Sequence, residues 1–303
     1  MGAIEDIALD LIGGVAGGKP NTRLVELRPY LPDNYFEEAA QLILDHPGRV
    51  MILTGFFIPR PYTNPLPDGG SVEFDGPIGA YGLGEGLRRL DYEVTYVSDK
   101  WCTFAYKDVP GAEDYVEFPI TGFKESREFA LNLLDEKKPS IVIATERCGV
   151  TAYQRYHNGR GWDISEFTAK LDALMDNHPH TIGIGDNGNE MGLGNFAGGI
   201  IETILHPRPE PTITRSTKPI LGCSSDWGCY GLLTALSKLT KRDVLTTGQE
   251  VGDFIRQCSA RGMLTGSGQT GKFEVDGRPI EHQVELLGSL RNVLKKEGIA
   301  TRE

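Results

Sequence analysis

The sequence predicts an α/β protein with a mostly parallel, open sheet of at least five strands and helices on both faces. Short apolar runs without polar alternation recur along the chain, and segments with helical periodicity separate them. Apolar runs of this kind fit strands that are buried on both faces, as in a parallel sheet. Their regular alternation with helical segments is typical of an α/β fold, with any ligand site at the carboxyl edge of the sheet.

Five apolar runs of mainly β-branched or aliphatic residues are the expected strands: 49–55, 94–99, 140–146, 181–186 and 219–224. Six segments are the expected helices because their apolar residues recur every three or four positions: 34–46, 126–138, 164–177, 230–239, 250–261 and 280–297. Asp163 and Glu166 form a helix start signal for the third of these segments. The proline-rich segments 59–70 and 206–219 are interpreted as excursions over the sheet edge. No repeat or linker divides the chain, so we expect a single domain over residues 1–303.

Composition excludes several classes of protein. The 303 residues include 31 Lys and Arg against 42 Asp and Glu, a net charge of −11 that disfavours nucleic acid and anionic membrane surfaces as partners. No apolar run approaches the roughly 18–20 residues of a membrane span. The first ten residues hold three acids and no base, unlike a targeting peptide. Five cysteines without a C-x-x-C pattern fit a reducing compartment. We therefore expect a cytoplasmic protein with a small-molecule substrate. Whether it forms a homo-oligomer stays open.

Acidic residues lie where the predicted strands end. They are Asp99, Glu146, Asp186 and Asp226, with Glu73 and Asp75 in the segment that follows the first strand. Any one of these acids has an alternative interpretation as a helix cap or a solvated turn residue. Because the carboxyl ends of parallel strands meet at one edge, we expect the acids to converge there.

Several carboxylates at close range repel one another unless a cation lies between them. Oxygen ligands without His or Cys suit Mg²⁺ or Mn²⁺ rather than zinc. The strongest local motif is the glycine-rich segment 183–194, from which Asp186, Asn189 and Glu190 offer side-chain oxygens. A tight glycine turn with a capping Asp is the alternative interpretation of this segment.

Two nucleotide-binding patterns match only in part. The segment 183–188 fits G-x-G-x-x-G, but Asp186 stands where a pyrophosphate would approach and no clean helix follows. The segment 266–272 fits most of a P-loop, but Phe273 replaces the required Ser or Thr and no apolar strand precedes it. Glycine-rich turns before an edge hairpin explain this second segment better.

The Glu146-Arg147 pair closes the third predicted strand and has two interpretations. It is either a structural ion pair or a way to place one cation against an anionic group of the substrate, for which Arg is the better fork.

Several motifs together resemble the D-glutamate cyclase-like family, long filed as a domain of unknown function. The matching stretches run over most of the chain: 54–56, 73–80, 146–149, 156–164, 183–194 and 227–231. The resemblance implies an α/β fold and an activity that closes D-glutamate to 5-oxo-D-proline with loss of water. It also implies a divalent metal, since one member is regarded as a manganese-dependent phosphatase. This chain differs from the family at Tyr153-Gln154, Asn187, Thr265-Gly266 and Asp226.

The roles expected from these observations are as follows. A Mn²⁺ or Mg²⁺ ion held by Glu73, Asp75, Asp186 and Glu190 would make the γ-carboxylate electrophilic. Asp99 and Glu146 are the candidate bases for the amine. Arg147, Asn158 and Asp226 are the candidate substrate-binding residues. Two rival functions stay open: a metal-dependent phosphatase for a small phosphoester, and a non-catalytic protein that binds a small molecule or a metal.

Overall fold

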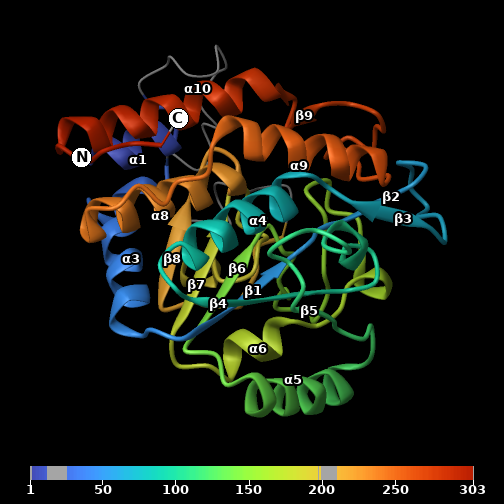
Figure 1. Ribbon diagram of the computed structural model, residues 1–303. Coiled ribbons are helices and arrows are strands. Elements are labelled where there is room, and N and C mark those ends of the chain that lie inside the picture. Colours follow the sequence, from blue (N-terminus) through green and yellow to red (C-terminus); the bar gives the residue numbers. More distant parts are fainter. Residues whose placement is uncertain (1, 12–25, 197, 199–209, 303) are drawn as a thin grey trace.

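The computed structural model describes residues 2–11, 26–196, 198 and 210–302 of the chain. Its centre is a six-stranded sheet in which every neighbouring pair is parallel, in the order β5-β4-β1-β6-β7-β8 (Figure 1). The predicted α/β class and the five predicted strands are confirmed. The strands are β1 (Arg49–Thr54), β4 (Glu93–Ser98), β5 (Tyr115–Glu117), β6 (Ile141–Thr145), β7 (Thr181–Gly185) and β8 (Lys218–Leu221).

Strand β1 occupies the middle of the sheet. Its residue Ile52 lies opposite Tyr96 of β4 on one side and Ile143 of β6 on the other. From β1 the sheet continues with β4 and β5 in one direction and with β6, β7 and β8 in the other. The order therefore reverses between β1 and β6, and the carboxyl edge at such a switch point is where ligands bind in open α/β sheets.

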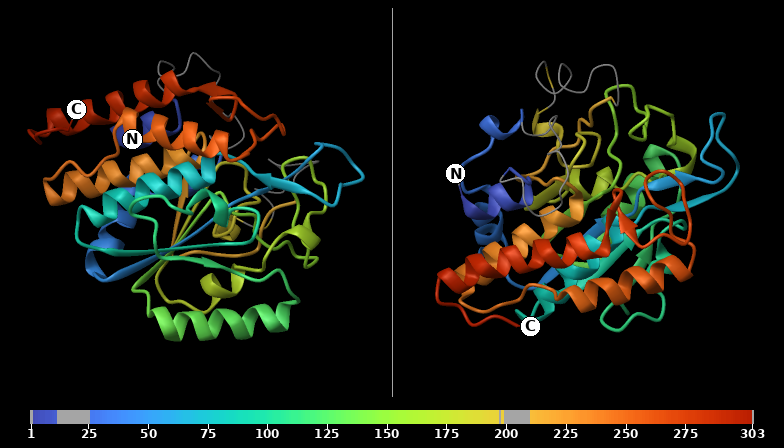
Figure 2. Two further views of the ribbon diagram at one scale, coloured as in Figure 1. Left: turned by 45° about the vertical axis from the view of Figure 1, so that its right-hand side comes forward. Right: turned by 90° about the horizontal axis from the view of Figure 1, so that it is seen from above.

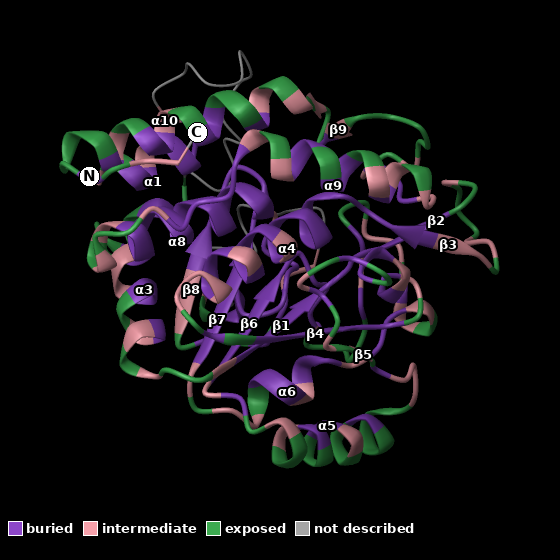
Figure 3. Ribbon diagram, viewed as in Figure 1, coloured by how far each residue is buried: buried purple, intermediate pink, exposed green. Residues whose placement is uncertain are grey.

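The two faces of the sheet belong to different hydrophobic cores. In β1, Val50 and Ile52 pack into the larger core with helices above the sheet, whereas Met51 and Leu53 pack into a second core below it. This alternation explains why β1 has no polar residue between its two ends: both faces are covered. Figure 3 shows the central strands of the sheet buried along most of their length, with most exposed residues on the outer helix surfaces and loops.

Most helices lie on one side of the sheet (Figures 1 and 2). There α9 and α10 pack on the helices α4 and α8, which cover the sheet directly. The helices of this side are α1 (Ala3–Ala8), α3 (Tyr35–Asp45), α4 (Asp75–Arg88), α8 (Ser225–Thr240), α9 (Gly248–Ala260) and α10 (Ile280–Lys296). The opposite side carries α5 (Phe123–Lys137) and α6 (Asp172–Asp176). Among the described residues, no helix combines the length and apolar character that crossing a membrane requires.

The prediction of one helix over 164–177 is wrong. A single 3-10 turn, Ser165–Phe167, is followed by extended backbone at Thr168 and then by the short α6. Asp163 accepts hydrogen bonds from the amide and hydroxyl of Ser165 and so caps the turn, not a helix. The chain leaves helical geometry because both backbone groups of Ala169 bind side chains that follow β4 and β6, a tertiary contact that overrides local periodicity.

Helix α4 and strand β5 were not expected from the sequence. Helix α4 contains five glycines, which lower helix propensity but permit close packing. A Cβ atom at Gly79 would lie 2.8 Å from the Cα atom of Asp226, so α4 and α8 approach each other to near backbone contact. Strand β5 lies at the sheet edge, and two of its three residues are exposed, so it lacks the apolar run that marks the other strands.

Two hairpins lie outside the main sheet. The proline-rich segment 59–70 is the loop of an antiparallel hairpin of β2 (Phe57–Pro59) and β3 (Gly70–Val72). The predicted hairpin after the second glycine-rich segment is confirmed as β9 (Glu274–Val275) and β10 (Arg278–Pro279), and it forms its own two-stranded sheet. Part of the other proline-rich segment, 206–209, lies outside the described residues.

Candidate metal centre and substrate cavity

Acidic side chains meet at the carboxyl edge of the sheet, as the strand order requires. Asp99, Glu146 and Asp186 directly follow β4, β6 and β7, which run in the same direction. Asp75 is the first residue of α4, and Glu73 is tied to the end of β1 because its amide donates to the carbonyl of Phe56. The predicted convergence at one edge is therefore found for these residues.

Two groups of three acids, within the part of the chain that the structure describes, have the spacing of metal ligands. Asp75, Glu146 and Asp186 form one group, and Glu73, Asp75 and Asp276 form the other. In each group the carboxylate oxygens lie within 4.8 Å of one another. Asp75 belongs to both groups, so the two form one continuous acidic cluster.

Burial makes this cluster electrostatically unfavourable in the absence of a cation. Burial, followed by the charge of Asp276, raises the pKa of Glu73 to about 8. Burial and then neighbouring carboxylates raise the pKa values of Asp75, Glu146 and Asp186 well above their usual range. Like charges at close range in a low-dielectric site cannot all ionise. Without a cation, the cluster therefore keeps protons to a higher pH than separate carboxyl groups would.

An unusual backbone conformation and a hydrogen bond position Glu146 in the cluster. Its φ of 40° lies in the left-handed region, which costs a non-glycine residue energy and is concentrated at functional sites. The hydroxyl of Ser225, at the start of α8, donates to the Glu146 carboxylate at 2.6 Å. Helix α8 therefore supports the side chain that follows β6.

A cavity of about 200 Å³ opens over the cluster. Glu73, Glu146 and Asp186 line it together with Asn158 and Asn189. Both asparagine side chains are buried and each has one polar atom without a protein partner, Nδ2 of Asn158 and Oδ1 of Asn189. An unpartnered acceptor beside three acids fits a cation, and an unpartnered donor fits an anionic oxygen of a ligand.

The glycine-rich segment gives Glu190 a different environment from the one expected. Its carboxylate accepts hydrogen bonds from the amides of Asn187 and Gly188 at 2.9 and 2.6 Å. A Cβ atom at Gly185 would lie 2.7 Å from the Glu190 carboxylate, so only glycine fits at that position. Glu190 belongs to neither acidic triad, but its side chain forms a hydrogen bond with Asp186, a member of one of them. Its predicted role as a metal ligand stays a prediction.

Asp99 and Arg147 form a buried ion pair instead of facing the cavity. The Arg147 side chain is 1% exposed, and its Nη2 lies 2.7 Å from Oδ2 of Asp99. Its Nη1 donates to the carbonyl of Gly55 and its Nη2 to that of Ala169. The contacts of Arg147 thus match the structural interpretation of this residue, with Asp99 and not Glu146 as the partner. This geometry supports neither Arg147 as a substrate clamp nor Asp99 as a base.

Asp226 lies at the start of α8, beside the cluster but not on the cavity wall. Its Oδ1 accepts a hydrogen bond from the hydroxyl of Ser224 at 2.5 Å, and its Oδ2 is buried without a partner. Burial raises the pKa of Asp226 to about 7. Its charge raises the pKa of Asp75. Asp226 thus contributes to the electrostatics of the cluster, and its predicted substrate contact stays a prediction.

Sequence reasoning missed Asp276, which completes the second triad from the turn between β9 and β10. The Asp276-Gly277 dipeptide is a strong hairpin-turn signal. This signal identifies the turn, but only the packing of the hairpin brings the carboxylate to the cluster.

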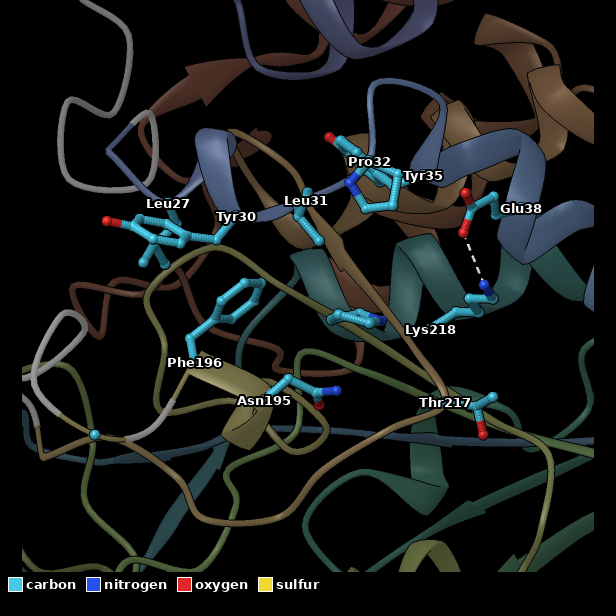
Figure 4. Close-up of a pocket in the computed structure, with 12 residues that line it drawn as sticks. Leu27, Tyr30, Leu31, Pro32, Tyr35, Glu38, Asn195, Phe196, Thr217 and Lys218 are labelled. Carbon is cyan, nitrogen blue, oxygen red and sulfur yellow. Dashed lines mark hydrogen bonds and ion pairs between the residues drawn. The ribbon is translucent and has the colours of Figure 1, made fainter.

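A larger cavity of about 460 Å³ lies elsewhere, between the start of α3 and the start of β8 (Figure 4). Figure 4 shows its apolar wall, with Leu27, Tyr30 and Phe196 facing one another. Glu38 is the one acid among the described residues that line it, and it forms an ion pair with Lys218 at 2.7 Å. The described lining therefore does not have the chemistry of the strand-end cluster.

Comparisons with known proteins agree with the motifs of the sequence. The model of the family described as "D-glutamate cyclase-like, C-terminal" matches residues 21–291. The chain is 28% identical to the human protein "D-glutamate cyclase, mitochondrial" over 216 residues, which are 65% of this chain and 34% of that protein. The match thus spans about a third of the length of the human relative. An exopolyphosphatase-related protein from Bacteroides fragilis is similar over 90% of this chain and 62% of its own, with 14% identity and a TM-score of 0.42.

Proposed function

The chain belongs to the D-glutamate cyclase-like family, and we propose that it closes D-glutamate to 5-oxo-D-proline with loss of water, assisted by a divalent metal ion. The observation that carries the proposal is the buried triad of Asp75, Glu146 and Asp186 under a cavity of small-molecule size. The similarity to the human D-glutamate cyclase supports the same reaction.

The residues fit a hard divalent cation such as Mn²⁺ or Mg²⁺. The triad supplies carboxylate oxygens, and Oδ1 of Asn189 is a buried acceptor on the same cavity wall. Oxygen ligands of this kind are those that hard cations prefer. An amine does not attack a bare carboxylate. A bound ion would polarise the γ-carboxylate of the substrate and so make its carbon electrophilic.

The proton balance of the reaction assigns a role to Glu73. The new bond joins the amine nitrogen to the γ-carbon, and one C–O bond of the γ-carboxylate breaks. The substrate ammonium loses two protons, and both leave with the departing oxygen as water. Glu73 lines the cavity and lies outside the triad that we assign to the cation, so it is our candidate to carry protons from nitrogen to oxygen.

A metal-dependent phosphatase is the second candidate, and one observation favours it. The two acidic triads share Asp75, so two cations held close together would suit this cluster. Paired metal ions about 4 Å apart are typical of phosphoryl-transfer sites. A small phosphoester would then occupy the cavity in place of D-glutamate.

Turnover with a defined metal tests the proposal. The purified protein with Mn²⁺ should convert D-glutamate to 5-oxo-D-proline, measured by mass spectrometry, and should act on the L-enantiomer much more slowly. Asp186→Asn should abolish the conversion, whereas the matched control Glu38→Gln, which alters an ion pair far from the cluster, should retain it. Hydrolysis of a phosphoester panel with the same metal requirement, and no conversion of either enantiomer, would support the phosphatase instead.

A further inference from the structure

A cavity other than that of Figure 4, also of about 460 Å³, adjoins the acidic cavity, and two arginines line it. The two cavities share Tyr62, Gly266 and Asp276 as wall residues. The second cavity is also lined by Arg160 and Arg278, which come from the loop after β6 and from β10. The acidic cluster and the two guanidinium groups therefore lie at adjoining cavities.

Aromatic rings fix the orientation of both guanidinium groups. The Cζ atom of Arg160 lies 5.0 Å from the ring centre of Tyr62 and 5.7 Å from that of Trp162. The Cζ atom of Arg278 lies 5.2 Å from the ring centre of Trp227, and its Nη2 donates to Sγ of Cys223. Contact with an aromatic ring holds a guanidinium in place, and the fork of N–H groups that arginine offers suits carboxylates.

Asn158 contacts the loop that carries Arg160 and also lines the acidic cavity. Its Oδ1 accepts hydrogen bonds from the amides of Arg160 and Trp162, each at 3.0 Å, and so sets the course of this loop. Its Nδ2 is a buried donor without a protein partner on the wall of the acidic cavity. A buried donor in this position indicates a ligand with an acceptor oxygen.

We infer that Arg160 and Arg278 bind the α-carboxylate of the substrate where the two cavities adjoin. Asn158 donates a hydrogen bond to one of the carboxylate oxygens of the substrate. This inference rests on the proposed function, in which the γ-carboxylate lies over the acidic cluster. An anion that approaches a cluster of acids needs compensating positive charge. Glu274 and Asp276 also line the arginine cavity and offset part of its positive charge.

The inferred clamp replaces the role that the sequence suggested for Arg147. That guanidinium is already occupied by Asp99 and two backbone carbonyls. Arg160 and Arg278 line the cavity that adjoins the acidic one. The specificity for a substrate with two carboxylates therefore resides in the loop after β6 and in the hairpin of β9 and β10.

Binding of ligands that cannot form a lactam ring tests the clamp separately from the reaction. The Mn²⁺-loaded protein should bind glutarate, which has two carboxylates, at least about tenfold more tightly than butanoate, which has one. Isothermal titration calorimetry measures both. Arg160→Gln and Arg278→Gln should each lower the affinity for glutarate about tenfold and leave that for butanoate unchanged. Equal affinities in the wild type, or unchanged glutarate binding in both variants, would overturn the inference.

Controls separate the clamp from folding and from the reaction itself. Arg155→Gln removes an exposed arginine of the same loop, paired with Asp163 at 3.7 Å, and should leave glutarate binding unchanged. Arg278→Lys keeps a cation at this position but not the fork, so it should also weaken glutarate binding while Mn²⁺ affinity is retained. If D-glutamate is not converted but the glutarate pattern holds, the proposed function fails and the clamp stands. If D-glutamate is converted with an unchanged KM in both glutamine variants, the clamp fails and the function stands.

Discussion

Two groups of buried charges lie at the same edge of the sheet, and they differ in how those charges are balanced. Arg147 and Asp99 form an ion pair whose donors and acceptors also bind backbone groups. The cluster around Asp75 contains carboxylates alone, with raised pKa values and unpartnered asparagine atoms beside it. A buried charge with its counter-charge in place fixes the fold, whereas a buried cluster of one sign indicates a missing ligand.

The largest expected effect comes from breaking the ion pair. Arg147→Met leaves the Asp99 carboxylate buried without a counter-charge and should lower the free energy of unfolding by about 3–5 kcal/mol, measured by urea denaturation. Addition of Mn²⁺ should not restore the loss, since the pair lies outside the cluster. The double variant Arg147→Met, Asp99→Leu should recover part of it. A loss below about 1 kcal/mol in Arg147→Met would contradict the structural role.

The stability of the metal-free protein should fall as the pH rises, because the cluster contains carboxyl groups with raised pKa values. The pKa of Glu73 is raised from 4.5 to about 8 on folding, so the folded protein binds the extra proton. The resulting stability is complete below pH 4.5 and is lost as the pH rises through about 8, at ~1.4 kcal/mol per pH unit for each such group. Thermal unfolding with EDTA should therefore show a decline from pH 5 to pH 8. Mn²⁺ should reduce this decline, and a stability that rises over this range would exclude the raised pKa.

Removing one carboxylate from the cluster should have an effect opposite to that of breaking the ion pair. Asp186→Asn relieves repulsion and should stabilise the metal-free protein at pH 8 by ~1–2 kcal/mol. The same variant should lose the stabilisation that Mn²⁺ gives to the wild type. Differential scanning fluorimetry with and without Mn²⁺ measures both effects. Destabilisation of the metal-free variant would mean that Asp186 makes a structural contact that the protein needs.

The smallest expected effect concerns a partly exposed network away from the sheet edge. Glu250 accepts hydrogen bonds from the amide of Thr247 and from Arg89 and Arg302, and these contacts lower its pKa from 4.5 to about 2. Its contribution is present above pH 4.5 and is lost as the pH falls through about 2. Glu250→Gln should cost ~1 kcal/mol of unfolding free energy at pH 7, because a helix cap is weakened. A cost that persists below pH 2 would show that packing and not charge is responsible.

The sequence predicts the strands well because parallel strands that are covered on both faces need uninterrupted apolar runs. It also predicts the convergence of Glu146 and Asp186, since the strand ends of a parallel sheet share one edge. Helix α4 escapes prediction because its glycines disfavour a helix in isolation and serve close contact with α8. The helix expected over 164–177 fails for a similar reason, a tertiary contact at Ala169.

The site is less predictable than the fold because its partners come from distant parts of the chain. The pairing of Arg147 with Asp99 depends on the packing of loops that follow two different strands. Asp276 reaches the cluster only through the position of a hairpin near the end of the chain. Residue type identifies the acids, but burial and partners decide which of them face the cavity.

Calorimetric titration of metal-free protein with Mn²⁺ tests the central claim most directly, namely that the acidic cluster holds a cation. The wild type and the control Glu38→Gln should bind Mn²⁺ with the same affinity, and binding should release protons from the buried carboxyl groups. Asp186→Asn and Glu146→Gln should each abolish binding or weaken it at least about tenfold. Mn²⁺ and Mg²⁺ affinities that are unchanged in both cluster variants, while their fold is intact, would contradict the account.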